Sequence, residues 1–289
     1  MWSTRLHWSF APTRTRLQTA LSEGTLNGFA SLDREGVAAY ATYALDGARG
    51  IVGSFFASAR VQASGLEALL VRRVLDHLEP YRLDVIDCQT LFSSAPELKE
   101  PFQAKGFASA SRRYMMLDRA SWLASRRALP ATRATRSVHR THLRDLSRLI
   151  FEGHQGSSRL DASSSFDTLD SCEKILRQIT IDEVCGPFDS FCSRRIEEES
   201  QTISACLVTW PHHGVFHVSE VATAPERRRQ GLARQCLTET LASAFERPET
   251  KGATLSVTAS NRAAIALYES LGFRSHIEYQ SHVWRGGRA

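Results

Sequence analysis

The sequence predicts an α/β fold, a mixed sheet flanked by helices, in two parts of similar size. The chain has 289 residues, which is roughly two domains at about 150 residues each. Helical apolar stripes alternate along it with short strand-like runs. Its 42% hydrophobic and 23% charged residues are typical of folded proteins and exclude a disordered or collagen-like chain. No stretch approaches the ~20 apolar residues of a membrane span.

The second half shows these elements most clearly. Helical patterns cover residues 142–152 and the stretch containing Leu169, Ile175, Leu176 and Ile179. Strand-like runs follow at 187–196, 202–209 and 215–223, joined by hairpin-like turns at 197–200 and 211–214. We then expect a helix from about 231 to 245, a strand at 253–259, a helix capped by Asn261 and ended by Gly272, and a strand near 277–284.

The first half has a similar order of elements. Strands are predicted at 37–45 and 51–57 around the turn Asp46-Gly47, then a helix at 65–78 and a strand at 83–88. A segment over 98–105 ends in Gly106-Phe107, and a last strand covers 112–117. Residues 119–137 hold Pro130 and five arginines but no acid, which is typical of a linker with, at most, a short helix at its start. We therefore predict domains at 1–120 and 137–289, with a basic linker at 121–136.

Charge and cysteines narrow the class of protein. The net charge is +5 and the pI is about 9.0, but the arginines are spread along the chain without interleaved aromatics, so nucleic acid is not the expected partner. The six cysteines form no CxxC pair and no cluster with zinc spacing, so we expect neither a metal nor a disulfide. Single scattered cysteines, and an N-terminus without the apolar core of a secretory signal, favour a cytoplasmic location.

One segment carries the features of an anion site. A strand turns at Pro225, and Arg228-x-x-Gly231-x-Ala233 then opens a helix. Small residues let the backbone approach a ligand, the first-turn amides lack helical partners, and the helix dipole adds roughly +0.5 of a charge. Arg228 and Arg229 could add charge-assisted contacts, so the segment predicts a pyrophosphate site. The absence of GK[ST] and GxGxxG disfavours a triphosphate or a dinucleotide. A helix start that is merely basic is the alternative.

A second motif follows the next strand: Asn261-x-x-Ala264-x-x-Leu267-Tyr268-x-x-x-Gly272-Phe273. In this order the two motifs resemble the GNAT superfamily of acyl-CoA-dependent N-acyltransferases, with the close match over about 205–275. The resemblance implies a twisted sheet that splays open between the strands ending at Thr223 and near Ala259, with acyl-CoA in the opening. The first half looks like a degenerate copy in tandem, because Arg60–Gly65 lacks the paired small residues and Phe102 has no tyrosine hydroxyl. An unrelated α/β domain is the alternative there.

The resemblance also implies roles for individual residues. The backbone of the strand end would pair with the pantetheine arm, and the turn would hold the pyrophosphate. The cofactor-binding set is Val221, Ala222, Thr223, Arg228, Arg229, Gln230, Gly231, Leu232, Ala233 and Asn261. Tyr268 would lie near the thioester sulfur and protonate the departing thiolate. The alternative is that Tyr268 is a core aromatic residue that packs beside Leu267.

The general base stays open between His217 and Glu220, and each could equally be structural. A regular strand would point them to opposite faces, so only a bulge would let both face the opening. A neutral histidine suits the task, whereas a glutamate would need its pKa raised by burial. Members of the family place an acid at the position of His217, so the histidine is a departure.

The sequence thus predicts transfer of an acetyl group from acetyl-CoA, as co-substrate, to a primary amine by direct attack in a ternary complex. A non-catalytic acyl-CoA sensor or interaction module is the alternative, and a nucleic-acid binder acting through Arg227–Arg229 is a distant third. The acceptor is a small-molecule or peptide amine. Asp161, Asp167 and Asp170 mildly favour a cationic small molecule such as a polyamine or an aminoglycoside, although a solvated loop explains them equally well. The acceptor's identity, the acyl chain length and the oligomeric state are left open.

Overall fold

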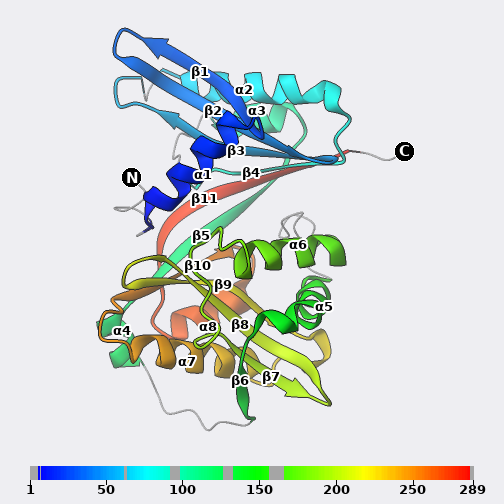
Figure 1. Cartoon of the computed structure of the whole chain (residues 1–289), viewed down its shortest axis with the longest axis vertical. Helices are drawn as coiled ribbons and strands as arrows, with labels where there is room; N and C mark the ends of the chain where they lie inside the picture. Colours follow the sequence, from blue (N-terminus) through cyan, green and yellow to red (C-terminus); the bar gives the residue numbers. More distant parts are fainter. Residues whose placement is uncertain are drawn as a thin grey trace. The chain divides into compact units, whose positions relative to one another are not determined.

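A computed structural model describes residues 6, 8–61, 64–91, 98–125, 133–155 and 166–286 (Figure 1). The chain divides into two compact units. Of the described residues, unit 1 comprises those within 10–112 and 278–286, and unit 2 comprises those within 6–9 and 113–277. Among the described residues, no helix is long and apolar enough to cross a lipid bilayer.

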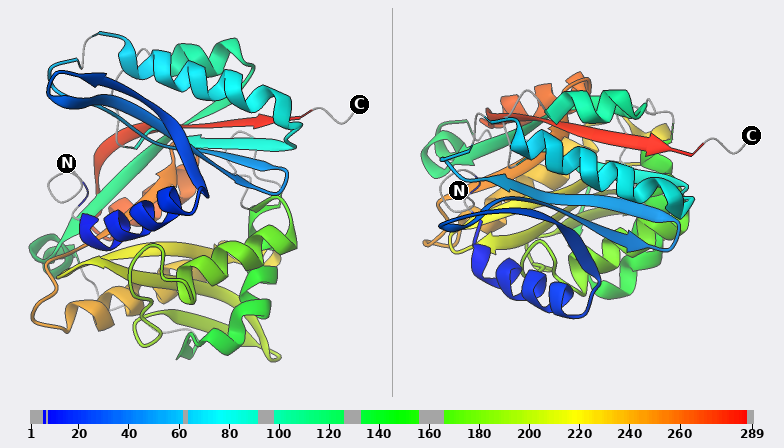
Figure 2. Two further views of the ribbon diagram at one scale, coloured as in Figure 1. Left: turned by 45° about the horizontal axis from the view of Figure 1, so that its top comes forward. Right: turned by 90° about the horizontal axis from the view of Figure 1, so that it is seen from above.

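Unit 1 is a mixed sheet covered by a long helix (Figure 2). Its strands lie in the order β1-β2-β3-β4-β11, and only β3 and β4 are parallel neighbours among the pairs with a defined register. The buried residues of α2 pack with those of β2, β3 and β4 in one hydrophobic core. The bounds in this unit are α1 Phe10–Ser22, β1 Leu26–Asp33, β2 Gly36–Asp46, β3 Arg49–Ala57, α2 Leu66–Leu78, β4 Val85–Gln89 and α3 Lys99–Ala104.

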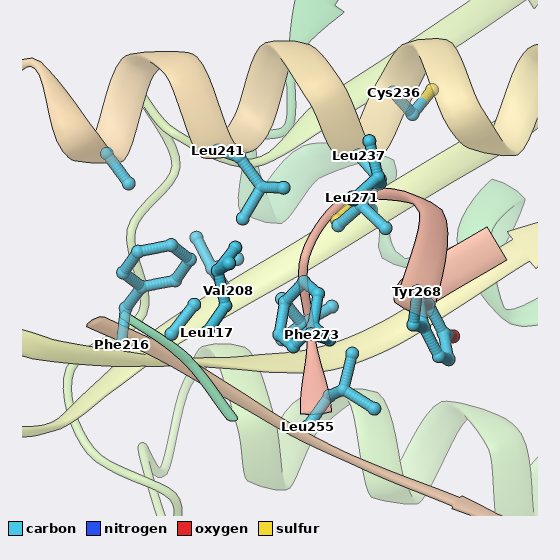
Figure 3. Packing of buried hydrophobic residues seen from close by; sticks show 14 of the residues in the cluster. Leu117, Val208, Phe216, Cys236, Leu237, Leu241, Leu255, Tyr268, Leu271 and Phe273 are labelled. Atoms are coloured by element: carbon cyan, nitrogen blue, oxygen red, sulfur yellow. The ribbon is translucent and has the colours of Figure 1, made fainter. Parts of the chain in front are cut away.

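Unit 2 is a sheet with a helical layer on each face. Its strands lie in the order β5-β10-β9-β8-β7-β6. α7 and α8 pack on one face around Phe216, Leu241 and Phe273 (Figure 3), while α5 and α6 pack on Leu207 and Ala222. The bounds are α4 Arg119–Ser125, β6 Thr135–Ser137, α5 Leu143–His154, α6 Leu169–Thr180, β7 Arg194–Glu198, β8 Gln201–His212, β9 Val215–Thr223, α7 Leu232–Phe245, β10 Gly252–Thr258 and α8 Arg262–Ser270.

The last strand of each half of the chain crosses into the other unit. β5 (Ala108–Asp118) leaves unit 1 after Arg112, and its remaining residues belong to unit 2 beside β10. β11 (Arg274–Arg285) follows α8 of unit 2 but pairs antiparallel with β4 of unit 1, from Ser281 opposite Gln89 to Arg285 opposite Val85. Each unit is therefore completed by a strand from the opposite half of the sequence.

The two halves repeat one local geometry. In each, a parallel strand pair is joined over four residue pairs, β3 with β4 and β9 with β10. The helix after the first strand begins behind a left-handed glycine, Gly65 (φ 71°, ψ 2°) or Gly231 (φ 81°, ψ 0°). The later short helix ends in each half with a backbone hydrogen bond of about 3 Å. The Phe107 amide donates to the Phe102 carbonyl, and the Phe273 amide donates to the Tyr268 carbonyl. Phe102 therefore stands at the position of Tyr268.

The predicted α/β class is confirmed, with corrections in detail. The strand expected at 187–196 begins only at Arg194, because the Asp189 carboxylate and carbonyl accept the amides of Cys192 (2.9 Å) and Ser193 (3.0 Å) in a tight turn. Three further elements, α1, β1 and β6, were not predicted from the sequence. The segment expected to be a linker contains α4, the short helix expected at its start, and also β6; residues 126–132 lie outside the described residues.

Candidate active site

The candidate site lies where β9 ends and α7 begins. After Ala224, residues Pro225–Arg227 form a short 3-10 helix, η6. Arg229 (φ 61°) and Gly231 (φ 81°) then adopt left-handed backbone conformations. Such a conformation costs a side-chain-bearing residue roughly 1–2 kcal/mol, which explains the glycine at 231. α7 begins directly afterwards, without a side-chain hydrogen bond to cap it.

The start of α7 presents backbone amides to open space. The Gln235 amide makes the first bond of the helix, 2.9 Å to the carbonyl of Gly231. The amides of Leu232, Ala233 and Arg234 precede that bond and have no acceptor within the helix. Apart from Gly231 itself and its immediate neighbours in the chain, no atom of the described residues lies within 4 Å of the point that a Cβ on Gly231 would occupy. An amide-rich helix start beside open space fits the diphosphate of an acyl-CoA.

The arginines of this turn are held in different ways. Arg227 forms an ion pair with Glu198, which also pairs with Arg133 at 2.6 Å. The Arg228 guanidinium donates to the carbonyl of Gly153 near the end of α5. Arg228 therefore ties the predicted pyrophosphate turn to a helix that the motifs do not include.

A cavity of about 710 Å³ extends from the turn into the gap between β9 and β10. These parallel strands pair only over Val215–Val218 and Gly252–Leu255, and beyond the pairs Thr258 lines the cavity. Nine of the ten predicted cofactor-binding residues line it too: Val221, Ala222, Thr223, Arg228, Arg229, Gly231, Leu232, Ala233 and Asn261. Gln230 is not among the lining residues, and its side chain lies 3.5 Å from the Glu226 carbonyl.

Tyr268 lines the same cavity from α8 and is only 8% exposed. Its ring packs edge-on against Phe273, with 6.0 Å between centroids, and its hydroxyl points away from that ring (Figure 3). Burial raises the pKa of the Tyr268 hydroxyl above its usual value, and Glu220 and Cys206 add to the rise. The hydroxyl therefore keeps its proton at neutral pH.

Asn261 makes a helix-capping hydrogen bond at the edge of the cavity. Its side-chain oxygen accepts the Ala264 amide at 3.1 Å and caps α8, which confirms the cap expected from the sequence. The same residue lines the cavity, so the cap and the ligand surface coincide.

A bulge in β9 brings His217 and Glu220 to one face. Leu207 pairs with Glu220, whereas the next residue of β8, Val208, pairs with Val218, so Ser219 is the extra residue. Phe216 and Val218 belong to the core with α7, which places His217 on the opposite face. Glu220 lies on that opposite face too, because its carboxylate is 3.6 Å from His154 of α5.

The surroundings of His217 and Glu220 nevertheless differ. His217 is 9% exposed, and its Nδ1 lies 2.9 Å from the Thr254 hydroxyl. Its ring contacts Trp8 edge-on at 5.2 Å and stacks on Tyr114 at 6.2 Å. Burial lowers the pKa of His217 to about 4, so the ring is neutral at pH 7. Neither His217 nor Glu220 lines the cavity, but the Glu220 carboxylate lies 3.6 Å from the side chain of His154, which does.

That residue, His154, was missed as an individual site residue. It lines the cavity, together with Gly153, from the C-terminal end of α5. The sequence pointed instead to three acids in the polar stretch that follows it. Of the acids noted there, Asp161 lies outside the described residues, and Asp167 and Asp170 are exposed and absent from the cavity lining. Within the described ranges, no group of three or more His, Cys, Asp or Glu is placed to hold a metal ion.

An open helix start, a parallel strand pair that separates beyond four residue pairs, and a buried phenol line one cavity, an arrangement that suits an acyl-CoA. Comparison with known proteins agrees. The model of the acetyltransferase (GNAT) family matches residues 162–273. This match over residues 162–273 supports membership of the GNAT superfamily, whose members carry out acyl-CoA-dependent N-acyl transfer.

Solved structures of similar fold cover nearly the whole chain. A GCN5-related N-acetyltransferase from Sphaerobacter thermophilus is 17% identical, with a TM-score of 0.63 over 89% of this chain and 81% of its own. A tandem GNAT protein from the clavulanic acid biosynthesis pathway is 14% identical, with a TM-score of 0.62 over 91% and 84%. A GCN5-related N-acetyltransferase from Kribbella flavida is 15% identical, with a TM-score of 0.52 over 94% and 95%. These identities support the fold alone. None of the curated proteins matches the sequence.

Proposed function

We propose that the protein transfers an acetyl group from acetyl-CoA to a primary amine by direct attack in a ternary complex. The observation that carries the proposal is that the Tyr268 side chain lines the same cavity as the open amides at the start of α7. A ligand whose diphosphate lay on those amides would extend its thioester along β9 toward the phenol. The acceptor is a small-molecule or peptide amine, and the expected location is cytoplasmic.

The cofactor-binding residues have separate tasks in this proposal. The amides of Gly231, Leu232 and Ala233, with Arg228 and Arg229, hold the diphosphate. The backbone of Val221–Thr223 pairs with the pantetheine arm, and Asn261 borders it. Gln230 contributes its backbone amide only. Acetyl-CoA supplies the activated acyl group and the thiolate leaving group.

Tyr268 donates a proton to the thiolate as the carbon–sulfur bond breaks. Its raised pKa makes a lasting phenolate costly, so the proton must be replaced in the same step. The attacking nitrogen, which must lose a proton as the amide forms, is the natural source. Tyr268 therefore passes a proton from nitrogen to sulfur and ends the step protonated.

The first proton of the ammonium must leave before the nitrogen can attack. We assign this task to the side of the site that holds Glu220 rather than to His217. Glu220 lies beside a cavity-lining residue, whereas His217 is enclosed by Trp8, Tyr114 and Thr254.

Unit 1 is proposed not to acylate. The position matching Tyr268 is held by Phe102, which is fully buried and carries no hydroxyl. Its ring is stacked at 4.1 Å on His282 of β11, so the equivalent space in unit 1 is filled by aromatic side chains.

The test is release of free thiol from acetyl-CoA in the presence of primary amines: a polyamine, an aminoglycoside, a free amino acid and a peptide N-terminus. We expect amine-dependent release by the wild type and a loss of at least about 100-fold in Tyr268→Phe with unchanged CoA affinity. CoA binding without turnover on any amine would instead support the sensor alternative. Failure to bind CoA would refute the proposal in both forms.

A further inference from the structure

A histidine–glutamate pair outside the motifs borders the cavity. His154 lines the cavity, and its Nε2 lies 3.6 Å from Oε1 of Glu220. The side chain of Glu220 is 13% exposed and that of His154 is 30% exposed. The imidazole therefore lies at the cavity surface with the carboxylate behind it.

The fold fixes the plane of the His154 ring. The ring stacks on Phe166 with centroids 4.0 Å apart and planes 3° from parallel. Backbone contacts hold the same end of α5 in place. The Gly153 carbonyl accepts a hydrogen bond from the Arg228 guanidinium. A Cβ at position 153 would meet the Thr223 carbonyl oxygen and Ala222 at ordinary van der Waals distances of 3.6 and 3.8 Å, so this end of α5 lies close to β9.

Most of the charges and dipoles around this pair are negative. Glu220 faces it from β9, and His154 is the last residue of α5, where the helix dipole is negative. Asp167, next to Phe166, lies on the same side, because it acts on the same thiol as Glu220 does. Burial raises the pKa of the Cys172 thiol to about 11, and the charges of Glu220 and Asp167 both add to that rise. The opposing charge is Arg228, which is held by the Gly153 carbonyl.

We propose that His154 is the general base that removes a proton from the acceptor ammonium, and that Glu220 is the positioning residue that stabilises the imidazolium formed. This inference rests on the proposed acetyltransferase function and deepens it. It assigns the base to a residue of α5 rather than to either candidate on β9.

The protons and bonds balance. Neutral His154 takes one proton from the ammonium, and the freed nitrogen forms the new bond to the acyl carbon. The carbon–sulfur bond breaks, a second nitrogen proton reaches the sulfur through Tyr268, and the third remains on the amide. The imidazolium then releases its proton to water, so one free proton accompanies each amide and thiol.

The test compares His154→Gln with the wild type between pH 7 and 9, with acetyl-CoA saturating and an alkyl amine as acceptor. At pH 7 we expect kcat/KM for the amine to fall about 100-fold, within the usual contribution of a general base. An amine with a pKa near that of lysine becomes about 100 times more abundant in its neutral form between pH 7 and 9. The variant should therefore recover most of its loss at pH 9, whereas a purely structural defect would persist.

Further variants isolate the pair. Glu220→Gln should also lower kcat/KM at pH 7, and the double variant should lose little more than His154→Gln alone, since the two act as a unit. His213→Gln, in the exposed turn before β9, and Glu152→Gln, exposed on α5, are matched controls. The Kd for CoA, measured by calorimetry without turnover, should stay within about twofold in every variant. If His154→Gln fails to fold, Phe166→Leu should lower kcat by about tenfold without changing the KM for acetyl-CoA.

The outcomes separate the two proposals. Thiol release by the wild type, with an unchanged pH profile in His154→Gln, would overturn the role of His154 and leave the acetyltransferase function standing. An equal loss at pH 7 and 9, or fully additive losses in the double variant, would also overturn it. No thiol release by the wild type with any amine would overturn both.

Discussion

Replacement of Gly231 by alanine offers a direct test of the diphosphate site, because the chain contains its own control. Gly231 (φ 81°, ψ 0°) and Gly65 (φ 71°, ψ 2°) precede α7 and α2 with nearly the same backbone conformation, and neither helix has a side-chain cap. At both glycines the space around a new Cβ is open to 4 Å. Only Gly231 lines the cavity.

The stability cost should therefore be the same at both positions. A left-handed alanine costs roughly 1–2 kcal/mol, partly offset by about 0.4–1 kcal/mol from the stiffer unfolded chain. The net loss of about 1 kcal/mol corresponds to a fall in Tm of roughly 2–4 °C for units of this size. Differential scanning calorimetry of the two variants measures it.

The binding cost should differ between the two variants. At position 231 the methyl group would stand where the diphosphate approaches, and hydrogen bonds to a charged group contribute about 1.5–3 kcal/mol each. Loss of one such bond weakens CoA binding by about 10- to 100-fold in Gly231→Ala. Isothermal titration calorimetry with CoA should find the affinity of Gly65→Ala unchanged. Equal affinity losses in the two variants, or none in Gly231→Ala, would refute the placement of the diphosphate at the start of α7.

Three further outcomes are expected. Tyr268→Phe should lower kcat by about 100-fold or more while the Kd for CoA, from calorimetry, stays the same; a change in Kd alone would assign Tyr268 to binding. Asn261→Ala should lower the free energy of unfolding by about 1 kcal/mol through loss of the α8 cap, whereas Asn261→Asp should keep the cap and weaken CoA binding by charge repulsion; denaturant titration and calorimetry distinguish the two effects. Burial lowers the pKa of His217 to about 4 in the folded chain against about 6.5 unfolded. Its contribution to stability is therefore complete above pH 6.5 and is lost as the pH falls toward 4, by up to about 3 kcal/mol; denaturant titrations should show a flatter pH dependence in His217→Gln, and an unchanged slope would contradict the burial of a neutral ring.

The two helix starts that border the cavity could be predicted from the sequence because their signals are local. A helix that starts on Gly231 and another that starts on Asn261 are both encoded within a few residues, by a left-handed glycine and a side-chain cap. Both motifs follow strands with clear apolar runs. Local chemistry of this kind can be predicted without a partner, and the cap at Asn261 was.

Other features depend on contacts that are distant in the sequence. The proximity of His154 to Glu220 requires α5 to pack on β9, which no spacing between residues 154 and 220 could show. The strand β1 was missed because it is largely exposed, with a weak alternation of buried and exposed positions. The strand expected at 187–196 starts late because of the turn at Asp189. The Asp189 carboxylate accepts a hydrogen bond from the Cys192 amide, which in a strand would pair with a neighbouring strand.

The exchange of β5 and β11 means that the two halves of this chain cannot be treated as separable pieces. A fragment cut in the basic segment near residue 130 would take β5 away from β10, and the remaining fragment would keep β11 without β4. Shortening the C-terminus by a dozen residues would damage the unit built mainly from the N-terminal half and leave both sequence motifs, at 228–233 and 261–273, untouched. A truncation series would therefore report the loss of a strand far from the deletion in sequence, and activity measured on isolated halves would describe incomplete sheets.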